Sequence, residues 1–524
     1  MGNLSALAVV IGYISCVLIP YCIFKASYNL ISHPLKSYPG PLLARISDSY
    51  AGYYVLRRCL HLATWEDHRR YGSVMRYGPD RLIFNSATAL RDIYQNPKVT
   101  KSHLYLFSLN DGVPFIFNSL DSNAHLRKRK IIGPALSERS MRLFEPTLAE
   151  QIDIFLKQLF AAHSTPVNLT ERCRRLAMDV VAQLAFGFPL DLQVNDEHYC
   201  VVSGFSIANF RINSYMNFPF LSKLGLDALF KRSPLRKKLR SVVQRMITTR
   251  LAQDAKGKND FYSFVMEDLE TKSADFQQSE LFTESLFFIS AGGDTVSTAM
   301  ASLFFYLSRN QDCYDRLSRE IRTTFKSSRD IHGGPQLAQC RYLRACIDEA
   351  LRMSPPIGGT LWRQQADQNN EEQLVVDGHV IPKGTHVGVN IYSIHHNEEY
   401  FPEPFKFKPE RWLHSEDEHA SWKAESAASS ATQRAFTPFS VGARSCAGKP
   451  MAYLESSLLV AKTLWYFDFE KCGGSLGEIG SGREGAHGGR GRTGEFQLYD
   501  VITSRHDGPY LRFMPRGNYC EDLR

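Results

Sequence analysis

The feature that most restricts what this chain can become is a ten-residue segment close to its C-terminal end. It reads Phe439-Ser440-Val441-Gly442-Ala443-Arg444-Ser445-Cys446-Ala447-Gly448. Gly442 and Gly448 carry no side chain, so the backbone around Cys446 can turn tightly and lie against a flat group. Arg444 offers a planar cationic fork that suits a carboxylate. Because an apolar helical run begins after Gly448, we expect a helix N-terminus and backbone amides to favour a thiolate at Cys446.

Every defined position of this segment matches the haem-binding signature F-x-x-G-x-R-x-C-x-G of the cytochrome P-450 family, which the chain therefore resembles. The resemblance implies a mainly α fold with small β-sheets, the cytochrome P-450 fold, that binds haem b (iron protoporphyrin IX). It also implies that Cys446 is the axial thiolate ligand of the iron, which donates electron density and favours O–O cleavage. By the same resemblance Phe439, Gly442, Arg444 and Gly448 contact the cofactor.

Two further motifs follow the family's order. Glu349-Ala350-Leu351-Arg352 places an acid and a base on one helix face. Pro409-Glu410-Arg411-Trp412 is similar to the family's P-E-R-F element, with Trp412 in the place of Phe. The resemblance implies that Glu349, Arg352 and Arg411 form a buried structural network on the proximal side of the haem. Alone, the first motif is equally typical of a surface pair.

The segment Ala291-Gly292-Gly293-Asp294-Thr295 interrupts an apolar helical run. Two adjacent glycines cost a helix interior roughly 2 kcal/mol relative to alanine, so by themselves they indicate a helix end or a packing notch. The family resemblance implies instead a central helix over the haem, in which the glycines make room for O2. Asp294 and Thr295 are then the catalytic residues that relay protons to dioxygen. Val296 departs from the Ser or Thr that the family usually has there.

Cationic or donor side chains are expected around the haem propionates. His125 and Arg129 resemble the family's W-x-x-x-R, with His in the place of Trp, and Arg363 follows a Pro-Pro turn on a predicted strand. His395 resembles the first residue of the family's H-R-[DN] stretch. Together with Arg444 these residues are predicted to bind the cofactor, although each is also compatible with a solvated surface side chain.

The N-terminal residues 4–24 contain no charged residue. At the helical rise this run is roughly 30 Å long, which is enough to cross a bilayer core. We expect a retained transmembrane anchor, with a cleaved signal peptide or a core helix as alternatives. Lys25, Lys36 and Arg45 then place the body on the cytoplasmic side. The predicted location is the endoplasmic reticulum membrane, single-pass, with the catalytic domain facing the cytoplasm.

Residues 33–41 hold three prolines and predict a stiff, extended hinge. Residues 42–524 are then expected to form one haem-binding catalytic domain. Within it, residues 74–84 predict two short strands around a Gly-Pro-Asp turn, and residues 374–381 predict a hairpin around Asp377-Gly378. Most of the chain between these two stretches has helical spacing. Residues 473–494 hold ten glycines and predict a flexible insert on the surface.

The formal net charge is +8, from 62 Lys and Arg against 54 Asp and Glu, which is too mild for a nucleic-acid binder. It fits a solvated surface or a basic docking face, for which Arg127, Lys128, Lys130, Arg434 and Lys449 are candidates. Eleven cysteines without a C-x-x-C pair indicate a reducing compartment. Since no G-x-G-x-x-G follows a strand, electrons are expected from a separate protein. The resemblance implies NADPH-cytochrome P-450 reductase, with cytochrome b5 as a second donor.

The function implied is that of a haem-thiolate monooxygenase that uses O2 to hydroxylate or epoxidise a bulky apolar small molecule. The chain is most similar to microsomal members of fungal secondary metabolism that act on polyketides, terpenoids or alkaloids. Two alternatives stay open: a haem-thiolate isomerase or dehydratase, which needs no proton relay to O2, and a non-catalytic haem binder. By family position, substrate contacts are expected at residues 101–120, Phe287, Ala291, residues 357–360 and residues 502–503.

Overall fold

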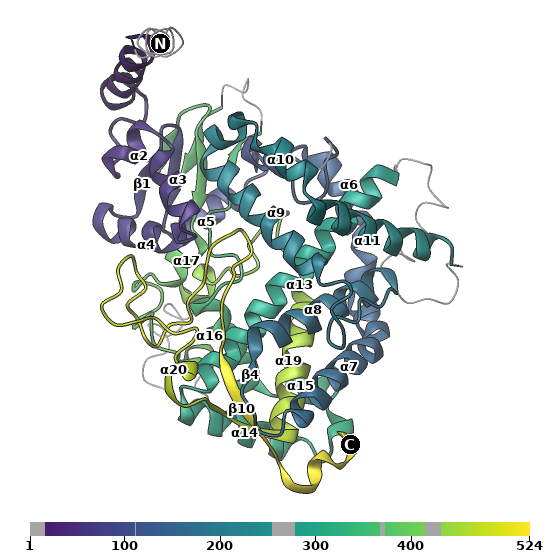
Figure 1. Ribbon diagram of the computed structural model, residues 1–524. Helices are drawn as coiled ribbons and strands as arrows, with labels where there is room; N and C mark the ends of the chain where they lie inside the picture. Colours follow the sequence, from purple (N-terminus) through teal and green to yellow (C-terminus); the bar gives the residue numbers. More distant parts are fainter. Residues whose placement is uncertain (1–15, 110–111, 254–277, 367–371, 414–430, 524) are drawn as a thin grey trace, which may run out of the picture.

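A computed structural model of the chain describes residues 16–109, 112–253, 278–366, 372–413 and 431–523 (Figure 1). The larger part is helical, as the three- and four-residue spacing of apolar side chains predicts. The α-helices are α2 (Leu42–Ile46), α3 (Ser49–Leu56), α4 (Leu60–Tyr71), α5 (Ala87–Tyr94), α6 (Ser122–Ile132), α7 (Glu138–Ala161), α8 (Leu169–Phe186), α9 (Cys200–Asn217), α10 (Leu226–Arg232), α11 (Pro234–Leu251), α13 (Gln278–Leu307), α14 (Gln311–Thr324), α15 (Pro335–Ala338), α16 (Arg341–Met353), α17 (Ile391–His395), α19 (Lys449–Tyr466) and α20 (Gly474–Gly477).

Shorter helical turns connect these elements. The π-helical turn is η1 (Tyr28–Ser32), and the 3-10 turns are η2 (His103–Ser108), η3 (Pro134–Leu136), η4 (Pro219–Leu224), η5 (Ser328–Asp330), η6 (Pro409–Trp412) and η7 (Gly517–Leu523). The strands are β1 (Val74–Gly78), β2 (Arg81–Phe84), β3 (Val99–Lys101), β4 (Val167–Asn168), β5 (Arg363–Gln365), β6 (Leu374–Val376), β7 (His379–Ile381), β8 (His386–Val389), β9 (Phe467–Lys471) and β10 (Tyr510–Pro515).

The strands form small sheets at the rim of the helical body. One sheet has the order β1-β2-β8-β5-β3, a second has the order β4-β10-β9, and β6 pairs with β7. The predicted hairpins are confirmed. In the second one Asp377 and Gly378 both have positive φ, at 49° and 76°, which is the conformation a two-residue type I′ turn requires. The architecture is therefore mainly α with small sheets, as the sequence predicts.

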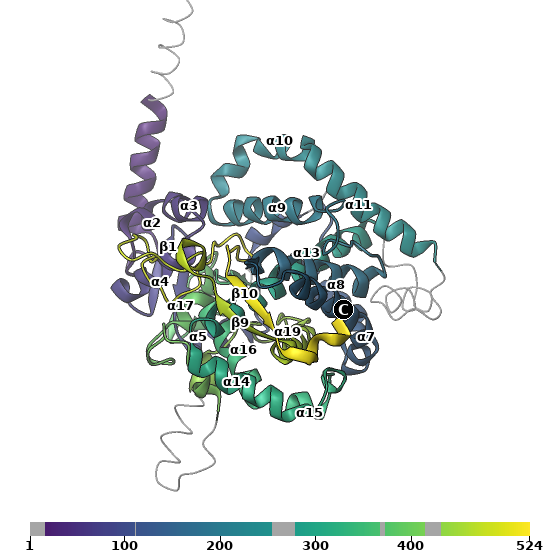
Figure 2. The same ribbon diagram turned by 60° about the horizontal axis from the view of Figure 1, so that its bottom comes forward.

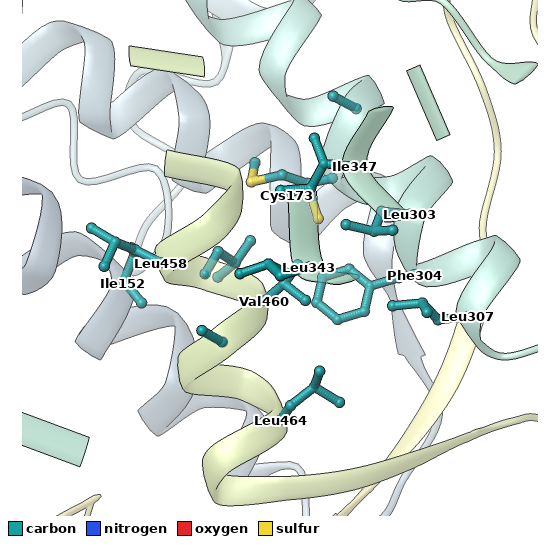
Figure 3. Packing of buried hydrophobic residues seen from close by; sticks show 14 of the residues in the cluster. Ile152, Cys173, Leu303, Phe304, Leu307, Leu343, Ile347, Leu458, Val460 and Leu464 are labelled. Carbon is teal, nitrogen blue, oxygen red and sulfur yellow. The ribbon is translucent and has the colours of Figure 1, made fainter. Parts of the chain in front are cut away.

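The largest hydrophobic core lies where α7, α8, α13, α16 and α19 meet (Figures 1 and 3). Figure 3 shows side chains from these five helices pointing toward one another. The labelled residues are Ile152, Cys173, Leu303, Phe304, Leu307, Leu343, Ile347, Leu458, Val460 and Leu464, all buried. The C-terminal half of α13 packs in this core, whereas its N-terminal half faces a cavity.

Gly292 and Gly293 have a packing role beside the predicted one of making room for O2, which stays a prediction. A Cβ atom on Gly292 would lie 2.8 Å from Cγ2 of Val181, and one on Gly293 would overlap the side chain of Met178. Both partners belong to α8. The glycine pair is therefore a packing notch that lets α13 approach α8, although Gly292 also borders the cavity.

Residues 16–27 are helical and lead into η1, and this segment projects from the body beside α2 and α3 (Figures 1 and 2). Its apolar side chains are exposed, among them Val17, Leu18, Ile19, Ile23 and Phe24. Residues 4–15 of the predicted anchor lie outside the described residues. Over the ranges that are described, no helix has both the length and the apolarity needed to span a bilayer.

The proline-rich segment 33–41 is not a wholly extended hinge. Two turns form at its start, where Lys36 N donates to His33 O (2.9 Å) and Tyr38 N to Leu35 O (3.2 Å). Leu35 is fully buried against the core of the five-stranded sheet, and Arg76 N donates to Pro39 O (2.7 Å). The segment is therefore attached to β1 and packs on the domain, while its role as a hinge stays a prediction.

The glycine-rich segment 473–494 also differs from the flexible insert that its composition predicts. Two arginines attach it to the body: Arg492 pairs with Glu495 (3.1 Å) and stacks over Trp65 and Phe405, at 4.4 and 3.9 Å from the ring centroids. Arg490 donates to Leu498 O (3.1 Å) and stacks over a further ring. Glycines suit this segment because the backbone crosses itself at short range, as at Gly482 against the Arg492 carbonyl.

Candidate active site

An internal cavity of about 710 Å³ lies between α13, α6, α8, α9 and the segment 437–448. Aromatic and aliphatic side chains dominate its wall, which is typical of a small-molecule site. Several predicted substrate contacts line it: residues 105–109 and 115–117, Phe287, Ala291, Ile357, Ile502 and Thr503. Residues 358–360, which were predicted with Ile357, do not line it.

Cys446 faces this cavity and is the single cysteine of the eleven that lines it. The Cys446 side chain has accessible surface, but this surface opens to the internal cavity rather than to bulk water. Burial therefore still raises the pKa of the thiol. The backbone amides of Gly448 and Lys449, at the start of α19, hydrogen-bond the sulfur, and with Arg129 and Lys449 they oppose the rise in the pKa. The expected helix N-terminus and amide donors are present.

The loop before Cys446 is held by backbone contacts. Cys446 N donates to Phe439 O (2.9 Å), which closes the loop, and Phe439 lines the cavity as predicted. Gly442 does not line it. Its φ is +76°, and a Cβ atom there would collide with the carbonyl oxygen of Tyr94, so only glycine allows the loop to lie against α5. Gly448 borders the cavity as expected.

Four cationic side chains converge on one side of the cavity: Lys101, Arg129, Arg363 and Arg444. Lys101 of β3 and Arg363 of β5 are direct partners across an antiparallel ladder, an arrangement that is unfavourable for like charges. Burial and then Arg363 lower the pKa of Arg444 to about 10, and the same two causes hold the pKa of Lys101 well below its usual range. Within the described ranges none of the four has an ion-pair partner; they bond to backbone carbonyls instead.

His125 lies in the same cluster and is neutral. Burial, followed by Arg444, Lys101, Arg129 and Arg363, lowers its pKa to about 3. Among the described residues, this cluster combines several cations with a neutral donor and has no ion-paired acid. It therefore suits an anionic partner. This fits a flat dianionic group such as a porphyrin with two propionates, placed against Cys446. The sequence did not single out Lys101 for this cluster, because its register opposite Arg363 is a tertiary feature.

Thr295 and Asp294 sit differently on α13. Thr295 lines the cavity, and its Oγ1 donates to Ala291 O (2.5 Å) in the preceding turn. Asp294 is buried behind the wall, where Oδ2 accepts from Asn209 Nδ2 and Thr503 Oγ1, both at 3.3 Å. Burial raises the pKa of Asp294, and Arg174 and Arg505 oppose the rise. Asp294 therefore does not line the cavity itself, and its hydrogen bonds to Asn209 and Thr503 connect it to the cavity wall.

Comparison with known proteins agrees with this geometry. A model of the Cytochrome P-450 family matches residues 60–478. The chain belongs to the cytochrome P-450 family. It is 36% identical over 518 residues to the cytochrome P-450 monooxygenase AKT7 of Alternaria alternata, covering 97% of this chain and 96% of that protein. It is also 36% identical over 528 residues to the cytochrome P-450 monooxygenase apf7 of Gibberella fujikuroi, covering 94% and 96%. With poxM of Penicillium oxalicum, a further monooxygenase of the family, it shares 33% over 502 residues, covering 93% and 91%.

Family members are haem-thiolate enzymes with haem b and an axial cysteine. In this member of the cytochrome P-450 family Glu349, Arg352 and Arg411 do come together. Arg352 donates from Nε and Nη2 to the two carboxylate oxygens of Glu349, both at 2.8 Å, and neither side chain has accessible surface. Arg411 Nε donates to Oε1 of Glu349 (3.1 Å). Trp412, where the family has Phe, donates its indole N–H to Oε2 (3.1 Å), which the sequence did not reveal.

His395, predicted to bind the cofactor, does not line the cavity. It lies at the end of α17, fully buried behind the cavity wall; its Nε2 accepts from Thr437 N (3.0 Å) and its carbonyl accepts from Arg352 Nη1 (2.8 Å). The helix turns the ring toward the segment that precedes Phe439, so His395 positions that segment instead.

Lys128 differs from the other residues of the predicted docking face. It is buried and pairs with Glu280 (3.2 Å) and Glu284 (3.0 Å), whereas Arg127, Lys130, Arg434 and Lys449 are exposed as a docking face would require.

We predict that Glu349→Gln destabilises the protein by about 3 to 5 kcal/mol, because Arg352 would be left as an uncompensated buried charge. The midpoint of urea unfolding, followed by circular dichroism, measures the change. Glu410→Gln is the matched control: Glu410 pairs with Arg316 (3.2 Å) at the surface, and we expect a loss below about 1 kcal/mol. Equal losses in the two variants would contradict the role of the network.

We also predict that His395 makes stability sensitive to acid. Burial, followed by Arg352, lowers the pKa of His395 from 6.5 to about 3, so the folded state favours the neutral ring. This contribution is complete above pH 6.5 and is lost as the pH falls toward 3; at pH 5 the loss is about 2 kcal/mol. The slope of unfolding free energy between pH 7 and pH 5 should fall in His395→Gln and stay unchanged in His332→Gln, which alters an exposed histidine. A slope unaffected by His395→Gln would refute the prediction.

Proposed function

We propose that this cytochrome P-450 monooxygenase hydroxylates or epoxidises a bulky apolar small molecule, an intermediate of fungal secondary metabolism such as a polyketide, terpenoid or alkaloid. The observation that carries the proposal is the cavity, whose aromatic and aliphatic wall holds the Cys446 sulfur and the Thr295 hydroxyl together. In the net reaction one oxygen atom of O2 enters a C–H or C=C bond. The other leaves as water, with electrons and protons supplied from outside.

The residues divide this work between holding the cofactor and moving protons. Haem bound through Cys446 would supply the reductive activation of O2. Arg129, Arg363 and Arg444, with Lys101 and His125, would hold its propionates. Thr295 presents a hydroxyl to the cavity, and Asp294 stands behind it as the acid. Because Asp294 is bonded to Thr503, which lines the cavity, a proton can pass from this acid to the cavity wall.

Electrons would come from NADPH-cytochrome P-450 reductase, with cytochrome b5 as a second donor. Arg127, Lys130, Arg434 and Lys449 are exposed cations that suit an acidic partner, because complementary charge steers association. Lys449 begins the helix that follows Cys446, so it lies near the thiolate side of the cofactor site.

We further propose that residues 4–24 anchor the protein in the endoplasmic reticulum membrane, single-pass, with the catalytic domain facing the cytoplasm. Support comes from the uncharged sequence of this run and from the exposed apolar side chains of residues 17–24, which project from the body (Figure 2). Lys25, the first basic residue, follows directly.

The proposed ligand is tested by the absorbance of the dithionite-reduced protein with carbon monoxide. We expect the red-shifted Soret band of a thiolate-ligated haem in the wild type and its loss in Cys446→Ala. Cys472→Ala is the control: Cys472 is a buried cysteine that does not line the cavity, so this variant should keep the band. A wild type without haem, or a histidine-type band that survives Cys446→Ala, would refute the assignment.

The proposed anchor is tested by alkaline carbonate extraction of microsomes that contain the full chain. The wild type should stay in the membrane pellet. Leu18→Lys combined with Ile19→Lys should move into the supernatant, because a lysine within the apolar run opposes insertion, by up to roughly 2.5 to 3.5 kcal/mol at the centre of a membrane helix. Tyr519→Lys, at an exposed position near the C-terminus, should remain in the pellet. Retention of the double variant would rule out the anchor.

A further inference from the structure

A small polar patch interrupts the apolar wall of the cavity. It consists of Asn209 on α9, Ser290 on α13 and Thr503 in the segment between the glycine-rich stretch and β10. Asn209 is 9% and Ser290 8% exposed, so both side chains are almost entirely enclosed and what surface they keep is open to the cavity. Around them the wall is apolar, with Phe205, Ile212 and others. A few polar groups on an apolar wall are what fixes the orientation of a ligand.

The contacts of Asn209 determine which way its amide points. Its Nδ2 lies 2.9 Å from Thr503 Oγ1, 3.2 Å from Ser290 Oγ and 3.3 Å from Asp294 Oδ2. Asp294 Oδ2 accepts from Asn209 Nδ2 and also from Thr503 Oγ1 (3.3 Å), so it presents an acceptor to the amide. The nitrogen must therefore face this cluster, and the amide oxygen must face away from it.

The amide oxygen Oδ1 is thus directed to the cavity. It accepts no hydrogen bond from the described residues, yet it is not among the buried polar atoms that are sealed off without a partner, so it keeps accessible surface. Beside it, Ser290 Oγ accepts from Asn209, and its own hydroxyl hydrogen has no acceptor in the described part of the chain. The patch therefore offers the cavity one acceptor and one donor.

We propose that Asn209 and Ser290 form a subsite that recognises a hydroxyl group on the substrate. A hydroxyl donates to Asn209 Oδ1 and accepts from Ser290 Oγ, and so uses both groups, whereas an amide N–H or an ether oxygen uses only one. The proposal rests on the proposed function and narrows it: the substrate is an apolar molecule that already carries a hydroxyl when it binds. An earlier hydroxylating or ketone-reducing step must then supply that group.

The enclosure of Asn209 Oδ1 makes this contact selective for ligands that carry a hydrogen-bond donor. An apolar ligand without a donor would seal Asn209 Oδ1 away from water and leave it unsatisfied, whereas an alcohol would satisfy it. We expect an alcohol to bind roughly five- to tenfold more tightly than its methyl ether, which corresponds to one net hydrogen bond. Thr503 cannot replace Asn209 here, since its hydroxyl accepts from Asn209 and donates to Asp294.

Equilibrium dialysis of the haem-loaded full chain tests the subsite. The probes are geraniol, farnesol and geranylgeraniol, each beside its own methyl ether. In the wild type at least one alcohol should show the roughly five- to tenfold preference, and in Asn209→Leu the ratio should fall to about one. Thr503→Val is the matched control: it also removes one donor to Asp294, but it leaves Asn209 Oδ1 in place, so the preference should persist.

Two results would overturn the proposal: a wild type with no preference in any pair, absence of binding included, or a preference that survives Asn209→Leu. The carbon monoxide spectrum of each sample separates this failure from that of the proposed function. A normal thiolate-type band with no preference for alcohols refutes the subsite alone. A wild type without that band refutes the haem-thiolate function itself.

Discussion

The ion pair between Glu349 and Arg352 is the interaction on which the thiolate side of the site depends. Both side chains are completely buried, so every hydrogen-bonding group on them needs a partner within the protein. The partners come from the end of α17 and from the segment that follows it: Arg352 binds the carbonyls of His395 and Pro404, and Glu349 accepts from Lys408 N. Satisfying the charges therefore fixes these segments in place. His395 in turn accepts a hydrogen bond from Thr437 N and so positions the loop that ends at Cys446.

The other side of the cofactor site is different. There, cationic side chains lie close together without ion-pair partners among the described residues. Lys101 and Arg363 face each other across a ladder, and burial together with Arg363 disfavours the charged forms of Lys101 and Arg444. Such a cluster stores unfavourable electrostatic energy that an anionic group would release. The protein therefore uses two kinds of charge: a closed network that needs nothing further, and an open one that is complete only with a cofactor.

The sequence predicted those features that depend on local pattern. The segment 439–448, the hairpin at Asp377-Gly378 and the i, i+3 pair of Glu349 and Arg352 each carry their information within a few residues. It could not predict what depends on distant neighbours. Gly442 is required by the carbonyl of Tyr94, and Gly293 by the side chain of Met178. The attachment of the glycine-rich segment likewise depends on distant neighbours, since Arg492 stacks on Trp65 and Phe405.

In the proposed function, the position of Asp294 would link substrate binding and proton transfer through shared hydrogen bonds. One carboxylate oxygen is bonded to Asn209 and Thr503, both of which line the cavity, while the other faces Arg174 at 4.0 Å. The acid is thus held between the wall that contacts substrate and a cationic group behind it. A ligand hydroxyl on Asn209 would polarise the amide whose N–H bonds Asp294, because hydrogen bonds in a chain strengthen one another. The same side chain that orients a substrate would therefore also adjust the acid that serves its oxidation.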